Sequence, residues 1–414
     1  MSLRVAALDL NGQWRGKRLA DAARDKVMTG ETRMPLSTLN LDLTGADIAG
    51  SPLVFESGDR DGTLLPVGRE VPMPWLRDAT LIPCAMHEGD APFEGDPLRA
   101  LSRALEPYAA RGWTVHAACE VEFYLTQPRA LAPPEGAEGP LLGDGIVSLD
   151  HLDDFAALFD DLYEGAESMG IPLGAAISEA GPGQFEIDVQ HQDAAKAALD
   201  AELLKLLIYG TAQRHGLGAT FLAKPYPDRS GSGLHVHMSV TDEGGNVLSR
   251  DQGLLKAAVA GCLAHMPGHT LLFAPFATSY MRLTPGAHAP VAAHWGHDNR
   301  TVALRIPAGP EAARRIEHRV AGADANALLV MAAMAGAAMD GMEQGLAPPP
   351  AVIGNAYEAQ AEGLPGSLSE AVERFDGWLF ADRLTENLLM TKRQEMGLVE
   401  GLDDAALREM HRAL

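Results

Sequence analysis

Four short segments of this chain alternate charged or imidazole side chains with apolar ones, and this spacing constrains the fold more than any other feature. The segments read H-A-A-C-E-V-E-F-Y-L (116–125), Q-F-E-I-D-V-Q (184–190), L-H-V-H-M-S-V (234–240) and R-I-E-H-R-V (315–320). Successive side chains of a β-strand point to opposite faces, so each segment predicts a strand with one polar and one apolar face. The apolar faces are expected to enter a core and carry Val121, Phe123, Ile187, Val236 and Ile316.

If the four strands lie side by side, their polar faces form one concave wall. The wall combines carboxylates, imidazoles and guanidiniums, from Glu120, Glu122, Glu186, Asp188, His235, His237, Ser239, Arg315, Glu317 and Arg319. Oxygen-rich walls with one or two imidazoles hold Mg²⁺ or Mn²⁺, and arginines beside them bind phosphate. The pattern is therefore typical of a nucleotide-using enzyme.

Each motif also has an ordinary structural explanation. A single E-x-E pair is usual on a solvated strand face, and a single H-x-H pair is more often structural than a ligand. The face with Arg315, Glu317 and Arg319 fits a salt-bridge ladder as well as a phosphate site, and the S-G-S-G segment fits a turn. The combination favours function, because Glu179 and Glu186 also flank a glycine-bearing loop.

The composition argues against several kinds of partner. The 414 residues carry a net charge of −23 with pI ≈ 4.9, which argues against nucleic acid or an anionic membrane. Three cysteines without C-x-x-C spacing predict neither disulfides nor a thiolate metal site, and they indicate a reducing cytoplasm. The longest apolar run, 325–339, is too short to span a bilayer, so we expect a buried helix there.

The chain divides into a strand-rich first part and a mixed second part. Strand-like segments within residues 1–88 include V-A-A-L-D-L (5–10), S-T-L-N-L-D-L (37–43) and S-P-L-V-F-E (51–56), and a loop-like stretch follows at 86–97. The clearest helices are predicted at 97–111, 152–169, 192–215 and 324–342, the third with Asp193 as its N-cap. We predict an α+β protein with a small β domain (1–88) and a larger domain (97–414) whose mostly antiparallel sheet is backed by helices.

Several segments, taken in order, resemble the glutamine synthetase family. They are A-C-E-V-E-F-Y-L, E-A-G-P-G-Q-F-E-I, K-P-Y-P-D-R-S-G-S-G-L-H-V-H-M-S, R-L-T-P-G-A-H-A-P-V, D-N-R-T-V-A-L-R-I-P and R-R-I-E-H-R, preceded by A-L-D-L-N-G-Q-W-R-G-K-R-L. The resemblance covers nearly the whole chain and implies a β-grasp-like N-terminal domain and a catalytic domain with a half-barrel sheet. It also implies hexameric rings or dodecamers with active sites shared between neighbouring subunits.

The resemblance implies a role for individual residues. Two to three Mg²⁺ or Mn²⁺ ions are expected beside ATP, one held by Glu122, Glu179 and Glu186 and a second by Glu120, His235 and Glu317. The substrate carboxylate would meet Arg282 and Arg319, with the backbone of Gly231 near the amino group. The ATP phosphates would meet Arg300, Arg305 and Arg315, and the nucleotide side would be lined by His237 and Ser239. Asp61 would reach the site of a neighbouring subunit.

The segment P-G-A-H-A-P departs from the pattern of the ammonium-using members. It places His288 where those members carry a glutamate that binds ammonium, and a neutral imidazole attracts NH₄⁺ less than a carboxylate does, although it can act as a base. Ser230 and Asp298 replace a usual asparagine and arginine nearby. The chain thus resembles the γ-glutamyl-amine ligase branch, which predicts an ATP-dependent ligase. Such an enzyme phosphorylates the γ-carboxyl of glutamate or a close analogue and forms an amide with an organic amine through an acyl phosphate.

Other functions stay open at this stage. An ordinary glutamine synthetase would tolerate His288, and a non-catalytic family member would act as a nitrogen sensor or scaffold. All six predicted metal-ligand positions carry competent residues, which disfavours the scaffold, and a guanidino kinase is more remote. Tyr357 lies near where some bacterial members carry a nucleotidylated tyrosine. The amine, the ring size and the choice between Mg²⁺ and Mn²⁺ are not specified by the residues.

Overall fold

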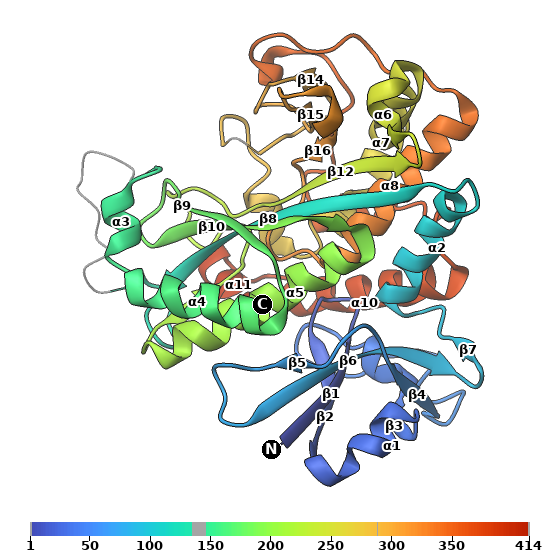
Figure 1. Ribbon diagram of the computed structural model, residues 1–414, viewed down its shortest axis with the longest axis vertical. Coiled ribbons are helices and arrows are strands. Elements are labelled where there is room, and N and C mark those ends of the chain that lie inside the picture. The colour runs from blue at the N-terminus through green and yellow to red at the C-terminus, as the bar shows by residue number, and fades with distance from the viewer. Residues whose placement is uncertain (1, 135–145, 288, 413–414) are drawn as a thin grey trace.

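Two β-sheets with helices packed around the larger one form the computed structural model, which describes residues 2–134, 146–287 and 289–412 (Figure 1). The smaller sheet is built from the first 92 residues, and the larger sheet from strands between residues 114 and 318. This mixed α+β architecture confirms the predicted fold class. Within those ranges, none of the helices has the length and apolar character that a membrane span requires.

The N-terminal sheet contains seven strands in the order β2-β1-β6-β4-β3, with β5 and β7 also paired to β6. The strands are β1 (Ser2–Leu8), β2 (Trp14–Ala20), β3 (Thr32–Pro35), β4 (Asp61–Pro66), β5 (Val71–Pro72), β6 (Ala79–Glu88) and β7 (Ala91–Pro92). β1 is parallel to β6 and antiparallel to β2. Leu3, Val5 and Ala7 of β1 alternate into a small core that also takes Val27 of helix α1 (Arg24–Met28).

Two N-terminal segments predicted as strands have other conformations. The first contains the 3-10 helix Leu36–Leu39, and the second forms turns over residues 52–58. Their apolar side chains are buried nonetheless, because Leu39 and Leu53 enter the small core. The Asn40 side chain donates to Thr391 at 2.6 Å, so the chain bends here to meet the C-terminal helices instead of pairing as a strand. The alternation in these two segments therefore predicted buried apolar side chains correctly, but the predicted strand conformation was wrong.

The larger sheet has nine strands, with β14-β15-β16-β12-β8-β10-β9 as its main order. The strands are β8 (Thr114–Thr126), β9 (Leu173–Ser178), β10 (Gln184–Asp193), β11 (Gly218–Thr220), β12 (Leu234–Asp242), β13 (Gly245–Asn246), β14 (Trp295–His297), β15 (Leu304–Ile306) and β16 (Ile316–His318). Only the β14–β15 pair among them is parallel. The mostly antiparallel sheet was therefore predicted correctly, and the four alternating segments correspond to β8, β10, β12 and β16.

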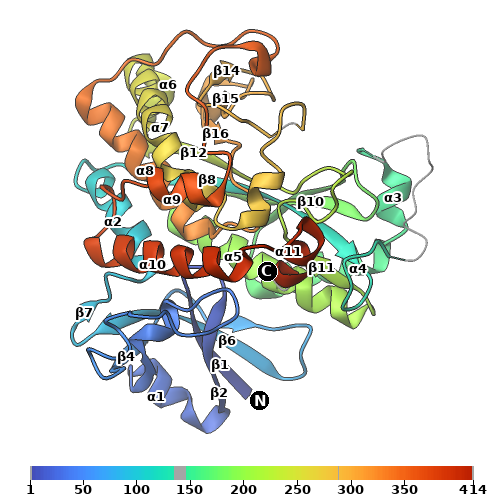
Figure 2. The same ribbon diagram turned by 180° about the vertical axis from the view of Figure 1, so that it is seen from behind.

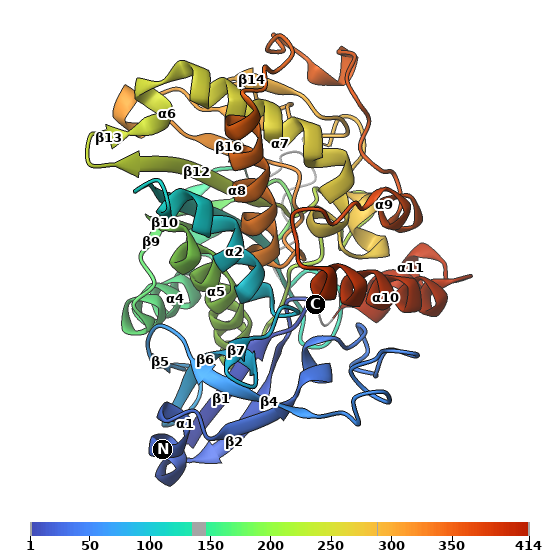
Figure 3. The same ribbon diagram turned by 90° about the vertical axis from the view of Figure 1, so that its right-hand side faces the viewer.

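Helices cover the apolar face of this sheet and extend around its edge. They are α2 (Pro97–Ala109), α3 (Leu149–Asp153), α4 (Ala156–Met169), α5 (Ala194–Arg214), α6 (Val247–Arg250), α7 (Gln252–Phe273), α8 (Ala327–Gln344), α9 (Leu368–Arg374), α10 (Asp382–Val399) and α11 (Asp404–His411). Figure 3 shows α2, α5 and α8 side by side. The predicted cap is present, since Asp193 accepts from the amides of Ala195 and Lys196. Val121, Ile187 and the other residues predicted for the apolar face are fully buried.

Helix α8 is the buried helix predicted from its apolar composition, and it packs very closely against α7. Gly261 of α7 faces Gly341 of α8, and a methyl group built on either glycine would lie 2.7 Å from the Cα atom of the other. Real Cβ atoms do not approach backbone atoms so closely. Glycine at these two positions therefore allows the backbones of α7 and α8 to touch.

Helix α10 joins the two sheets (Figure 2). Lys392 of α10 is fully buried, and its Nζ donates to Asn11 at 2.6 Å and to Glu395 at 2.8 Å. Asn11 also donates to Glu395 at 2.8 Å, which closes the triangle. Asn11 follows the first strand of the N-terminal sheet, so this buried triangle fixes that sheet to the C-terminal helices.

Candidate active site

The register of the large sheet aligns the polar faces of its central strands. Two rows of paired residues cross it: Asp188, Glu120 and His235 on β10, β8 and β12, and His237, Glu317 and Arg305 on β12, β16 and β15. Side chains on one face of a strand repeat every two residues, so the rows lie on one surface. The sheet therefore assembles the polar wall that the alternation predicted.

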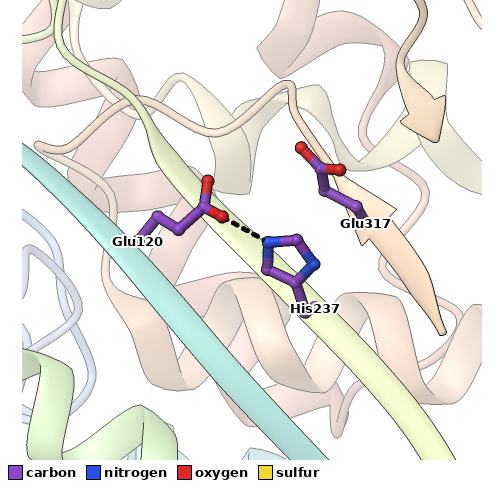
Figure 4. A group of neighbouring side chains, drawn as sticks. All are labelled: Glu120, His237 and Glu317. Carbon is purple, nitrogen blue, oxygen red and sulfur yellow. Dashed lines mark hydrogen bonds and ion pairs between the residues drawn. The ribbon is translucent and has the colours of Figure 1, made fainter. Parts of the chain in front are cut away.

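Three groups of side chains on this wall have ligand atoms close enough to share one cation. The ligand atoms lie within 4.8 Å of one another in Glu122, Glu179 and Glu186, in Glu120, Glu186 and His235, and in Glu120, His237 and Glu317 (Figure 4). The first group has the composition of the first predicted metal site. The second predicted site, Glu120 with His235 and Glu317, is divided between the other two groups. Mostly carboxylate donors with one imidazole fit Mg²⁺ or Mn²⁺.

The first group concentrates negative charge where water is scarce. Burial, followed by the charge of Glu122, raises the pKa of Glu179 to about 7. Burial, followed by the charges of Glu120 and Glu122, raises the pKa of Glu186 well above neutrality. Carboxyl groups this close hold protons unless a cation lies between them, so a divalent ion would replace protons here.

Both imidazoles of β12 contact Glu120. Nδ1 of His235 lies 2.9 Å from one carboxylate oxygen, and Nε2 of His237 lies 2.6 Å from the other. Burial opposes ionisation of Glu120, but these hydrogen bonds outweigh it and lower the pKa. Arg315 donates its Nε–H to Nδ1 of His237 at 3.1 Å, so the hydrogen of neutral His237 is on Nε2. His237 is thus a donor to Glu120, and His235 is the imidazole better suited to bind a cation.

Glu317 is 1% exposed, and each of its carboxylate oxygens meets an arginine. One oxygen accepts from Arg305 at 2.7 Å and the other accepts from Arg319. Burial alone would raise the pKa of Glu317, but the electrostatic interaction with His237 and Arg319 outweighs it and lowers the pKa. Arg305 also donates to Asp298 at 2.6 Å. Of the two arginines that alternate with Glu317 in the sequence, Arg319 contacts it as predicted, but Arg315 bonds to His237 and Arg305 of β15 takes its place.

Arg282 lies beneath the glycine-bearing loop 230–233 and is 4% exposed. It donates to the carbonyl oxygens of Val320 at 2.8 Å and Arg319 at 3.4 Å, which uses two of the five donors of a guanidinium. A methyl group at Gly233 would lie 2.6 Å from the NH2 atom of Arg282, and one at Gly231 would lie 2.8 Å from its Cγ. The two glycines are therefore needed for the arginine to pass under the loop.

A cavity of about 680 Å³ beside Glu120 is lined by residues of β8, β10 and β12. His237 and Ser239, which were predicted for the nucleotide side, line it together with Arg315, one of the three arginines predicted for the ATP phosphates. Its wall also includes His191, whose Nε2 lies 2.8 Å from the hydroxyl of Ser239. Three of the five residues predicted for ATP thus share one cavity that adjoins the carboxylate groups, whereas Arg300 and Arg305 do not line it.

Other predicted residues lie outside these groups. Arg300 is exposed and lies near Glu179. Asp61 begins β4 in the N-terminal sheet, at the opposite end of the molecule from β14, β15 and β16 (Figures 1 and 3). His288 lies outside the described residues. Tyr357 donates its hydroxyl to the carbonyl of Ala289 at 3.1 Å. A single subunit therefore does not bring Asp61 to the polar wall.

Sequence analysis missed two residues that hold the glycine loops. Gln184 is fully buried and donates to the carbonyl of Gly231 at 3.0 Å, and Tyr124 donates its hydroxyl to the carbonyl of Ser230 at 2.8 Å. The two residues are opposite one another in the β8–β10 pair. Each continues the polar face of its strand by one step, so extending the alternation beyond Glu122 and Glu186 would have found them.

Comparison with known proteins gives one consistent result. Residues 94–401 match the family described as glutamine synthetase, catalytic domain. The chain is 38% identical over 388 residues to the γ-glutamylputrescine synthetase PuuA of Escherichia coli (strain K12), covering 90% of this chain and 82% of that protein. It is 32% identical over 398 residues to the glutamate–isopropylamine ligase of Pseudomonas sp, covering 90% and 85%. A solved structure described as "Apo GmaS without ligand" shares the fold, with a TM-score of 0.86 at 24% identity over 97% of this chain and 94% of that one.

Proposed function

This chain belongs to the glutamine synthetase family, and we propose that it is an ATP-dependent ligase that joins an organic amine to the γ-carboxyl group of glutamate. The observation that carries the proposal is the similarity along most of the chain to a γ-glutamylputrescine synthetase and a glutamate–isopropylamine ligase. The polar wall supplies the residue types that such a reaction needs. The amine is expected to be a polyamine or a small alkylamine.

The reaction has two covalent steps. A carboxylate does not react with an amine at neutral pH, because oxide is too poor a leaving group. In the first step the γ-carboxylate oxygen of glutamate attacks the γ-phosphorus of ATP, ADP leaves, and an acyl phosphate forms. In the second step the amine nitrogen attacks the acyl carbon, loses a proton, and inorganic phosphate leaves. Both steps bring anions together, so the site must neutralise charge.

Carboxylates of the wall would hold two divalent ions, and the proposal allows a third ion without assigning ligands to it. Glu122, Glu179 and Glu186 would hold one, and Glu120, His235 and Glu317 the second. His235 is favoured over His237 because Arg315 occupies the acceptor nitrogen of His237. The ions, when bound, neutralise phosphate charge. The raised pKa values of Glu179 and Glu186, which follow first from burial, support cation binding in place of protons.

Arginines would bind the anionic ends of the two substrates. We assign Arg300, Arg305 and Arg315 to the phosphates of ATP, with His237 and Ser239 on the nucleotide side. Arg282 and Arg319 would bind a glutamate carboxylate, with the backbone of Gly231 near the amino group. The Nε atom of Arg319 is buried and has no hydrogen-bond partner among the described residues, so this donor is available to a substrate. Arg282 retains three further donors beside the two it uses for the backbone.

The amine would bind near His288, which would act as a base without attracting ammonium. Asp61 would complete the site from a neighbouring subunit, so the proposal includes a homo-oligomer built of hexameric rings. The position of Asp61 on the N-terminal sheet, away from the wall of its own subunit, supports a contribution in trans. The domains proposed for this arrangement are residues 1–88 and 97–414.

The test is Mg²⁺-dependent ADP release with ATP and glutamate, in the presence of ammonium, methylamine, ethanolamine, putrescine or spermidine. We expect one organic amine to be used at least about tenfold more efficiently than ammonium, with a product of the mass of its γ-glutamyl amide. The Glu122→Gln variant keeps the shape of the side chain without its charge and serves as the inactive control.

Ammonium used as well as every organic amine would refute the amine assignment. It would identify a glutamine synthetase, an activity named for a relative in Thermus thermophilus that is 35% identical over 72% of this chain. Full turnover by Glu122→Gln would instead refute the assigned metal site. The absence of ADP release with any amine would point to a different acceptor acid or to a non-catalytic member.

A further inference from the structure

Two glycine-bearing loops meet at the edge of the polar wall, and Gln184 lies between them. One is loop 179–183, which begins at Glu179, and the other is loop 230–233. The Gln184 amide donates to the carbonyl of Gly231 at 3.0 Å and accepts from the amide of Gly181 at 3.0 Å. The side chain is fully buried. The side-chain amide of Gln184 therefore connects the two loops and fixes the distance between them.

Tyr124 makes a second connection between the same loops. Its hydroxyl donates to the carbonyl of Ser230 at 2.8 Å. A methyl group on Gly181 would overlap this hydroxyl, so the tyrosine fits against the backbone of the first loop while it binds the second. The ring of Tyr226 packs edge-on against Tyr124 with 5.1 Å between centroids, which restricts its movement.

Other hydrogen bonds of loop 230–233 also use its main chain, including those that the amides of Glu122 and Ala323 donate to the carbonyls of Gly233 and Ser232, each at 3.0 Å. The amide of Gly233 donates to the Glu122 carboxylate at 2.7 Å, and the amide of Ser232 donates to the carbonyl of Ala223 at 3.0 Å. Two glycines give this loop many alternative conformations, so its shape depends on these contacts. Of the contacting side chains, Gln184 and Tyr124 are the ones to which the proposed function gives no role.

We propose that Gln184 and Tyr124 are positioning residues that hold loop 230–233 in the shape that binds the amino end of glutamate. The inference rests on the proposed function, because that function places the glutamate amino group beside Gly231. If either contact is lost, only a fraction of the molecules has loop 230–233 in the conformation that binds glutamate. The apparent affinity for glutamate is then reduced by that fraction. Gln184 also orients the loop that carries Glu179, so its loss acts on the metal site as well.

The test compares Tyr124→Phe and Gln184→Met with a matched control, Tyr108→Phe. Tyr108 is also a buried tyrosine that donates to a backbone carbonyl at 2.8 Å, that of Ala335, but it lies among the helices. We expect Tyr124→Phe to raise the KM for glutamate about threefold to tenfold and Gln184→Met about tenfold or more, with the KM for ATP within about twofold. Tyr108→Phe should lower the thermal midpoint and leave both KM values unchanged.

Two further measurements separate positioning from general loosening. Mn²⁺ affinity should fall in Gln184→Met and stay unchanged in Tyr124→Phe, because, of these two side chains, that of Gln184 is the one hydrogen-bonded to loop 179–183. Calorimetric binding of glutamate in the presence of Mg²⁺ and ADP should fall in both variants. Unchanged glutamate affinity in both variants, or equal rises in KM for glutamate, ATP and amine, would overturn the inference.

The same measurements distinguish this inference from the proposed function. If the wild-type protein binds glutamate but forms no amide with any amine, the proposed function fails in its amine step, and the binding comparison still decides the role of Gln184 and Tyr124. If the wild-type protein turns over glutamate and an amine while both variants match it, the inference alone fails. If the wild-type protein binds no glutamate, both fail.

Discussion

A divalent cation that binds Glu122, Glu179 and Glu186 should release protons in a number that depends on pH. Burial first, then neighbouring carboxylates, raises the pKa of Glu179 to about 7 and that of Glu186 well above neutrality. At pH 7, about half of Glu179 and nearly all of Glu186 therefore carry a proton, and a cation that requires both as carboxylates displaces about 1.5 protons. The same reasoning gives about 1.9 protons at pH 6 and about 1.1 at pH 8. Metal affinity consequently rises with pH.

Titration calorimetry with Mn²⁺ in buffers of different ionisation enthalpy measures this number. We expect the slope of apparent enthalpy against buffer enthalpy to fall between pH 6 and pH 8. The Glu179→Gln variant has no carboxyl group at position 179 to release a proton, so metal binding should release about one proton, that of Glu186, at each pH. A wild-type proton number that is zero, or the same at all three values of pH, would refute the argument from burial.

The same carboxyl groups set the stability of the metal-free fold. The pKa of Glu179 is 4.5 in the unfolded chain, as for an ordinary glutamate, and about 7 in the folded protein. Between these two pH values the folded protein keeps a proton that the unfolded chain has released. Because the native state binds more protons in this window, stability falls as pH rises through it. Thermal unfolding with a chelator should show this loss, and Mn²⁺ should reverse it. A midpoint that rises from pH 5 to pH 7 in chelator would contradict the assignment.

Four substitutions test other parts of the structure. Gly341→Ala should lower the thermal midpoint, because overpacking against the facing helix costs about 1–3 kcal/mol or more while the gain in helix propensity is only about 1 kcal/mol. Gly397→Ala, in an open position of α10, should raise the midpoint. A shift of the midpoint in the same direction in both variants would contradict the packing argument. Lys392→Met should cost about 3–5 kcal/mol in urea unfolding, because Glu395 would be left buried without its cation, and a loss below about 1 kcal/mol would show that the pair contributes little. Arg319→Ala should abolish ADP release with an unchanged circular dichroism spectrum, and retained turnover would remove Arg319 from the site.

The strands of the polar wall could be predicted because burial imposes a period on them. Val121 and Ile187 had to face the core, and that requirement alone assigned Glu120 and Glu186 to the opposite face. The partners of each side chain could not be predicted in this way. That His237 pairs with Glu317 depends on the register between β12 and β16, which are far apart in the chain. Register is set by long-range packing, and a local pattern does not contain it.

In the N-terminal part of the chain, the alternation of apolar residues failed to predict the local conformation itself. Leu39 is buried in a 3-10 helix and Leu53 in turns. Over so few residues, the period of three of a 3-10 helix is hard to distinguish from the period of two of a strand. A short apolar alternation therefore did not separate the two conformations. Likewise, the hydrogen bond from Arg315 that places the hydrogen of neutral His237 on Nε2 joins β12 to the residue before β16, so the local pattern of either segment does not contain it.

The main-chain anchoring of loop 230–233 bears on how this site could change in evolution. Gln184 and Tyr124 hold the loop by its carbonyl oxygens, which every residue type has, so the side chain at position 230 does not decide where the backbone runs. A point mutation there alters the groups displayed to a ligand while the scaffold keeps its shape. The resemblance noted from the sequence places Ser230, where an asparagine was expected, at a position of this kind. New selectivity can therefore arise in single steps, without an intermediate in which the loop must first refold.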